Sequence, residues 1–217
     1  LGDVYKRQPE RMHHLVSTVG AWTRLRHKPA SERRIAILMY QSRPDSGRIG
    51  GAAGLDTMQS VRDMLDRMSS LGYRVDHVPE TSRQLVDEIL DNITNDLEWS
   101  SEERVREKAA DMVPMSDYAP EYGKLSEFNR RRIEKSWGEA PGTVSVQDGR
   151  FVIPGIVNGN VYIGYQPLRS WADQMESVYH DPVVPMPHQY LAFYRWLKYS
   201  FKADAVVHVG THGTREW

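Results

Sequence analysis

One apolar run near the start of the chain constrains the fold more than any other feature. Residues 34–40 read Arg-Ile-Ala-Ile-Leu-Met-Tyr, a strand-length segment whose five inner residues are all apolar. A strand with one face in water alternates apolar and polar residues, whereas a continuous apolar run is typical of a strand covered on both faces. The sequence therefore predicts that this segment is a central strand of a parallel sheet.

The residues after this run continue the pattern of an α/β protein. A glycine-rich loop over 41–54 leads to Asp56, which forms a capping-box helix start with Gln59. The helix ends at Gly72, and a strand is expected over 73–78 and a further helix over 82–93. One stripe of the first helix is apolar: Val61, Met64, Leu65, Met68 and Leu71. This order forms a βαβ unit and predicts an α/β fold with a mainly parallel sheet.

The middle of the chain predicts a helical insertion followed by short hairpin strands. Helices are expected over 101–111 and 125–137, and strands over 143–166 with glycine turns at 148–149 and 158–159. Arginines at 130–132 stand beside Glu127 and Glu134. This pattern favours a solvated helix face and leaves open a role in holding carboxylates.

The N-terminal segment divides into two parts. Residues 1–8 have neither helical nor strand periodicity, and we expect them to be a non-native or artefactual leader. Residues 9–32 predict an amphipathic helix and a basic linker, because apolar residues recur every three or four positions.

Composition excludes several classes of function. The 217 residues carry 28 Lys and Arg against 29 Asp and Glu, so no excess charge attracts nucleic acid or an anionic membrane. The chain contains no cysteine, which excludes disulfides, thiolate metal sites and cysteine nucleophiles. No apolar run approaches the ~20 residues of a membrane span. We expect a cytoplasmic protein without a membrane span or a nucleic-acid partner.

The last residues predict a site at the end of a strand. Residues 204–209 read as a buried strand, and Gly210-Thr-His-Gly213 forms a turn at its carboxyl end, where α/β sheets bind ligands. His208 lies inside the strand, as either a packed core histidine or a ligand. His212 lies on the glycine-flanked turn, which favours a functional role. Glu216 is either part of the site or an acid at a helix start.

Five segments of the chain, in order, carry recognisable motifs: Arg48–Asp56, Gly159–Pro167, Tyr179–Pro182, Pro187–Trp196 and Ala205–Trp217. Together they closely resemble one protein family, the large subunits of cobaltochelatase and magnesium chelatase, and the last of them matches that family's HxGxHGxxEW segment. The resemblance spans about residues 35–217. The segments Tyr179–Pro182 and Pro187–Trp196 are more similar to the cobalt type than to the magnesium type.

The resemblance implies a function for the chain. Residues 33–217 would be an internal fragment of a chelatase large subunit, truncated at its C-terminus. The whole subunit would bind a tetrapyrrole, hydrogenobyrinic acid a,c-diamide, and insert a divalent metal, cobalt or alternatively magnesium, in cobalamin biosynthesis. AAA+-type ATPase partners and companion subunits would hydrolyse ATP, which agrees with the absence of a Walker sequence here.

The resemblance also implies the site residues. His212 and Glu216 would handle the metal and accept the pyrrole protons, with His208 as a further metal ligand, because neutral imidazole binds cobalt and a carboxylate accepts protons. Residues expected to contact the tetrapyrrole are His180, Asp181, His188, Gly50, Gly51 and Gly54. The histidines and Asp181 are equally consistent with turn or helix-start positions, and the glycines with tight turns.

Three alternatives remain open. The first is a magnesium chelatase large subunit that acts on protoporphyrin IX. The second is a tetrapyrrole-binding module that inserts no metal. The third is an unrelated α/β hydrolase or transferase with a His–Asp pair, although the chain has no Gly-x-Ser-x-Gly nucleophile motif.

Overall fold

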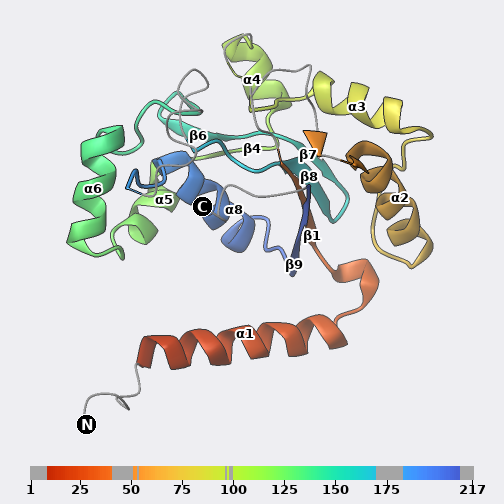
Figure 1. Cartoon of the computed structure of the whole chain (residues 1–217), viewed down its shortest axis with the longest axis horizontal. Coiled ribbons are helices and arrows are strands. Elements are labelled where there is room, and N and C mark those ends of the chain that lie inside the picture. The colour runs from red at the N-terminus through yellow and green to blue at the C-terminus, as the bar shows by residue number, and fades with distance from the viewer. Residues whose placement is uncertain are drawn as a thin grey trace.

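A four-stranded sheet organises the chain. The computed structural model describes residues 9–40, 51–52, 54–95, 97, 100–169 and 183–210 (Figure 1). The strand order is β7-β8-β1-β9, with β1 parallel to β8 and β9, and β7 antiparallel to β8. These strands are β1 (Ile35–Met39), β7 (Ile156–Asn158), β8 (Val161–Tyr165) and β9 (Ala205–Val209). All five residues of β1 are buried, so the predicted central parallel strand and α/β fold are confirmed.

Successive side chains of β1 enter two different layers of the core. Ile37 packs with α2 (Thr57–Ser70) and α3 (Ser82–Asp91), whereas Leu38 packs on the other side with α8 (His188–Tyr199). Figure 1 shows α2 and α3 on one side of the sheet and α8 on the other. Because neighbouring residues of a strand point to opposite faces, the uninterrupted apolar run supplies both layers at once.

The predicted helices begin at side chains that cap them. Asp56 Oδ1 accepts from the Gln59 backbone N–H at 2.9 Å, and Thr81 Oγ1 accepts from Gln84 N–H at 3.1 Å. Ser101 and Ser126 cap α4 (Glu102–Lys108) and α6 (Glu127–Trp137) in the same way. Each contact satisfies a backbone donor that has no acceptor within its helix.

The end of α2 differs in one respect from its prediction. Gly72 has the expected positive φ of 80°. Leu71, however, is 53% exposed and does not belong to the buried stripe. The reason is that α2 ends at Ser70, so Leu71 has already left the helical face that packs on the sheet.

The strand predicted over residues 73–78 does not form. The side chain of Asn158 takes the place of a neighbouring strand as the hydrogen-bond partner of this segment. Its Oδ1 accepts from Asp76 N–H and His77 N–H, both at 2.9 Å. Its Nδ2 donates to His77 O at 2.6 Å. The segment therefore runs beside the turn between β7 and β8 without joining the ladder.

The hairpins predicted in the middle of the chain are present. A three-stranded sheet has the order β4-β6-β5, where β4 is Asp111–Val113, β5 is Val146–Gln147 and β6 is Arg150–Ile153. Asp148 and Gly149 have φ values of 50° and 68°, as a two-residue hairpin turn requires. Gly159 has φ 64° in the turn between β7 and β8. A smaller hairpin joins β2 (Gly51–Ala52) to β3 (Leu55–Asp56).

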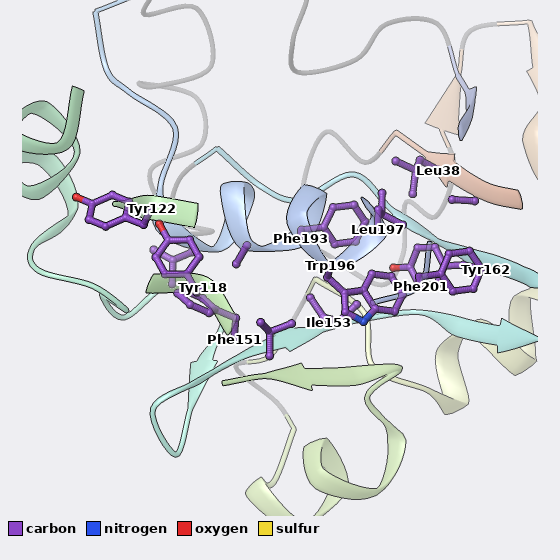
Figure 2. Close-up of a cluster of buried hydrophobic side chains, with 14 of the residues drawn as sticks. Leu38, Tyr118, Tyr122, Phe151, Ile153, Tyr162, Phe193, Trp196, Leu197 and Phe201 are labelled. Carbon is purple, nitrogen blue, oxygen red and sulfur yellow. The ribbon is translucent and has the colours of Figure 1, made fainter. Parts of the chain in front are cut away.

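Aromatic side chains join the two sheets through one core (Figure 2). The Tyr162 ring of β8 lies 5.0 Å from the Trp196 ring of α8, measured between centroids. Tyr118 of α5 (Met115–Tyr122) lies 4.7 Å from Phe151 of β6 by the same measure. These edge and tilted contacts are the geometries that aromatic pairs prefer. They fix α8 between the parallel sheet and the smaller sheet.

The N-terminal helix lies apart from this core. Figure 1 shows α1 (Pro9–His27) standing off from the sheet, to which it connects through a 3-10 turn, η1 (Ala30–Glu32). The predicted helix is therefore present, but its apolar side chains are 45% to 69% exposed: Met12, Leu15, Val16, Val19 and Trp22. Lys28 Nζ, just after α1, bonds Asp204 Oδ2 at 2.6 Å. Within the described ranges, no helix has the length and apolar character needed to cross a membrane.

Two glycine substitutions test the turn between β7 and β8. In Gly159→Ala, the new Cβ would meet the Arg74 carbonyl oxygen at 2.5 Å, whereas in Gly149→Ala it would meet nothing within 4 Å. Both positions have positive φ, so each substitution costs about 1–2 kcal/mol of unfolding free energy. We expect Gly159→Ala to cost about 1–3 kcal/mol more, because its clash involves backbone. Urea unfolding of both variants measures the difference, and equal losses would contradict the close approach of Gly159 to the Arg74 carbonyl.

Candidate functional site

The three parallel strands end together at one edge of the sheet. Met39 is paired with Tyr165 of β8 and with Val209 of β9, so all three carboxyl ends are level. Two further bonds continue the ladder past these ends, from Gln166 N–H to Met39 O at 2.9 Å and from Tyr40 N–H to Val209 O at 3.3 Å. This edge is where parallel α/β sheets bind ligands.

The strongest predicted site residues follow this edge directly in the sequence. His212 and Glu216 come after β9, whose last residue is Val209. Both lie outside the described residues, as do His180, Asp181 and Gly50. Their roles remain predictions. Within the described ranges, no three His, Cys, Asp or Glu side chains come together as a metal site.

His208 is a surface residue of β9. It is paired with Leu38 in the register, so its side chain lies on the α8 side of the sheet. The prediction of a buried strand is wrong for its middle residues: Val206 and Val207 are 42% and 37% exposed, and His208 is exposed as well. Within the described chain, β9 pairs with β1 alone and therefore lies at the sheet edge.

His188 is a buried, hydrogen-bonded histidine at the start of α8. It is 2% exposed, so its alternative interpretation as an exposed helix-start residue is wrong. The Nε2 atom lies 3.0 Å from Gly138 O, and Nδ1 lies 2.9 Å from Tyr118 OH. A carbonyl only accepts, so Nε2 carries the proton and Nδ1 accepts from the tyrosine. Both nitrogens are thus occupied by protein, and contact with a tetrapyrrole remains a prediction.

The described glycines of the predicted cradle form a small hairpin that leads into α2. Gly51 is paired with Asp56 across β2 and β3. Gly54 has φ 75° in the turn between these strands, a conformation that favours glycine. The tight turn accounts for Gly54, and anion binding by Gly50, Gly51 and Gly54 remains a prediction.

A buried glutamine that the sequence did not single out holds the carboxyl edge together. The Gln166 Nε2 donates to the hydroxyls of Tyr190 and Tyr194 at 3.1 and 3.0 Å, and its backbone O accepts from Asn95 Nδ2 at 3.0 Å. Nearby, Gln189 Nε2 donates to Leu168 O at 2.7 Å. In the sequence, the position of Gln166 directly after an apolar strand is the signal that could have identified it as a residue of the carboxyl edge. These bonds fix α8 against the end of β8.

Two of the three arginines at 130–132 contact neighbouring residues of the protein. Arg131 forms an ion pair with Glu127, and Arg132 donates to Val183 O. Arg132 also lies over the Phe128 ring, with its guanidinium carbon 5.6 Å from the centroid. These contacts support the solvated-face interpretation for two of the three.

Comparison with known proteins shows the family of the chain. A family model described as CobN/Magnesium Chelatase matches residues 2–217. The chain therefore belongs to the CobN and magnesium chelatase family, as the sequence motifs indicated.

Individual relatives agree with this membership. The aerobic cobaltochelatase subunit CobN of Pseudomonas aeruginosa is 35% identical over 98% of this chain, which spans 17% of that relative. A magnesium-chelatase subunit of Chlorobaculum parvum is 33% identical over 96% of the chain, which spans 16% of it. The catalytic subunit of cobaltochelatase from Mycobacterium tuberculosis has the same fold, with a TM-score of 0.79 and 30% identity over 97% of this chain and 18% of its own.

The buried histidine predicts a pH dependence of stability. Burial lowers the pKa of His188 below its ordinary value of 6.5, against smaller opposing effects of Gly138 O and Glu134. Below pH 6.5 the unfolded chain takes up a proton that the folded chain excludes, so stability falls as the pH drops. We expect urea unfolding to show a steeper loss from pH 7 to pH 5 in the wild type than in His188→Gln. Parallel losses in the two proteins would show that His188 does not titrate as expected.

Proposed function

We propose that the polypeptide carrying this chain is the large subunit of an ATP-dependent cobaltochelatase, which inserts cobalt into hydrogenobyrinic acid a,c-diamide in cobalamin biosynthesis. Family membership over residues 2–217 carries this proposal. The fold shared with a cobaltochelatase catalytic subunit, at a TM-score of 0.79, supports it. The Tyr179–Pro182 and Pro187–Trp196 segments, which resemble the cobalt type more than the magnesium type, favour cobalt.

The reaction sets three requirements for the protein. The divalent ion must lose its water, the macrocycle must be held, and two pyrrole nitrogens must lose their protons. In this proposal His212 binds the incoming ion through a neutral imidazole, and Glu216 accepts protons from the macrocycle. The exposed His208 is a further ligand on the strand that leads to them. The level carboxyl ends of β1, β8 and β9 support this placement.

Companion subunits complete the proposed reaction. The named relatives are called subunits, which supports a complex of several chains. ATP would be hydrolysed by AAA+-type partners, which agrees with the absence of a Walker sequence from these 217 residues. The complex would work in the cytoplasm.

A magnesium chelatase that acts on protoporphyrin IX is the second candidate. The 33% identity to the magnesium-chelatase subunit of Chlorobaculum parvum supports it. The two candidates share the protein chemistry and differ in the ion and the macrocycle. A tetrapyrrole-binding module without insertion activity would share only the binding.

Metal insertion by two variants tests the proposal. In the full polypeptide supplied with its ATPase partners, ATP, cobalt and hydrogenobyrinic acid a,c-diamide, we expect His212→Ala and Glu216→Gln each to lower the insertion rate by about 100-fold or more. Tetrapyrrole affinity should remain near that of the wild type, because neither change removes the walls that hold the macrocycle. The same assay with magnesium and protoporphyrin IX separates the two candidates.

A histidine at the other edge of the sheet provides the matched control. His77 N–H bonds the side chain of Asn158, the last residue of β7, which is paired with Val161 at the start of β8, so His77 lies by the amino ends of the parallel strands. His77→Ala should leave insertion unchanged. Insertion at the wild-type rate by both His212→Ala and Glu216→Gln would remove these two residues from the chemistry. Tetrapyrrole binding by a wild type that inserts neither metal would favour the binding module.

A further inference from the structure

Two buried hydroxyl groups have no hydrogen-bond partner among the residues that the structure describes. They are Thr57 Oγ1 and Tyr165 OH, whose residues are 3% and 1% exposed. Nearly all buried polar groups in proteins are paired, because an unpaired one loses its bonds to water without replacement. An unpaired buried hydroxyl therefore needs an explanation that packing alone does not supply.

Thr57 points toward the sheet from the first turn of α2. Val61 and Leu65 follow it four and eight residues later, and both are fully buried in the core layer between α2 and the sheet. Residues four apart share a helix face, so Thr57 continues this stripe at the N-terminal end of the helix. The neighbouring Asp56 caps Gln59 N–H from the exposed side and does not reach the Thr57 hydroxyl by a hydrogen bond.

Tyr165 points into the same layer from the sheet. It is the last residue of β8 and is paired with Met39, and both side chains belong to the core layer shared with α2. Its phenol thus extends from the carboxyl edge of the sheet toward the helices. Burial raises the pKa of Tyr165, so the hydroxyl stays protonated and able to donate.

The surroundings of these hydroxyls favour a ligand that accepts hydrogen bonds. Both groups can donate, and the first turn of α2 adds backbone N–H groups other than that of Gln59, which Asp56 already caps. A carboxylate only accepts, so it matches this set of donors. We propose that Thr57 and Tyr165 form a subsite for one carboxylate of the substrate macrocycle, which enters from the carboxyl edge of the sheet.

This inference rests on the proposed function, because corrins and porphyrins carry carboxylate side chains. The subsite would give the macrocycle a second point of contact with the protein, in addition to the predicted site after β9. A macrocycle held at one rim by Thr57 and Tyr165 has a fixed orientation relative to the segment that follows Val209, since β8 and β9 both flank β1. The subsite would thus orient the substrate, while the proposed chemistry takes place elsewhere on it.

Hydroxyl deletion in the full polypeptide tests the subsite. We expect Tyr165→Phe and Thr57→Val each to weaken binding of hydrogenobyrinic acid a,c-diamide, or of protoporphyrin IX if the wild type binds that macrocycle, by about 10-fold or more. Unfolding stability should stay the same or rise, because each change removes an unpaired hydroxyl and keeps the shape. The double variant should lose less than the product of the two effects, since both groups hold one carboxylate. Equilibrium titration of macrocycle absorbance measures these constants.

Tyr162 provides the matched control on the same strand. Its hydroxyl donates to Pro154 O on the opposite side of the sheet. Tyr162→Phe should therefore lower stability and leave macrocycle binding unchanged. For the porphyrin, the dimethyl ester should bind the wild type more weakly than the acid, and Tyr165→Phe should reduce this preference.

The outcomes separate the inference from the proposed function. Wild-type affinity in Tyr165→Phe and Thr57→Val would mean that the two hydroxyls hold only buried water, and the subsite would be overturned while tetrapyrrole binding stands. Fully independent effects of the two changes would also overturn the shared subsite. A wild type that binds neither macrocycle would overturn both the proposed function and the subsite.

Discussion

The pairing of β1 with two distant strands holds the rest of the structure in place. Ile35 is paired with Val161 on one side and with Ala205 on the other, so one strand fixes the register of segments from the middle and the end of the chain. The entropy cost of closing such long connections grows only slowly with their length. The burial of β1 on both faces offsets that cost, and its strict register brings three carboxyl ends to a common edge.

Polar side chains inside this framework decide how the helices sit on the sheet. Gln166 ties the end of β8 to two tyrosines of α8, and His188 ties the start of α8 to Tyr118 and Gly138. Apolar packing alone tolerates small sliding movements of a helix, whereas hydrogen bonds require a specific register. Different polar contacts thus fix α8 to the parallel sheet and to the helices around Tyr118.

The parts of the fold that local chemistry determines could be predicted from the sequence. The β1 run, the cap at Asp56 and the turn at Gly149 depend on neighbouring residues, and each is present. The strand expected over 73–78 failed because its partner is a side chain from a distant turn. The exposure of Val207 depends on which strands flank β9, which the sequence does not state. The unpaired hydroxyls of Thr57 and Tyr165 could not be predicted, because they depend on the packing of α2 against β8 in one core layer. His212 and Glu216, in contrast, were predicted from a motif and lie outside the described residues.

The use of Asn158 as a substitute for a strand partner has a consequence for the lifetime of the protein. Asn158 precedes Gly159, and its amide nitrogen donates to His77 O while its oxygen accepts two backbone bonds. Deamidation would replace that nitrogen with an oxygen facing a carbonyl, so one attraction would become a repulsion and the two accepted bonds would remain. The segment after α2 would then loosen from the β7–β8 turn. Because the Asn158 side chain takes the place of a strand partner, deamidation of this one residue would weaken the attachment of the segment after α2.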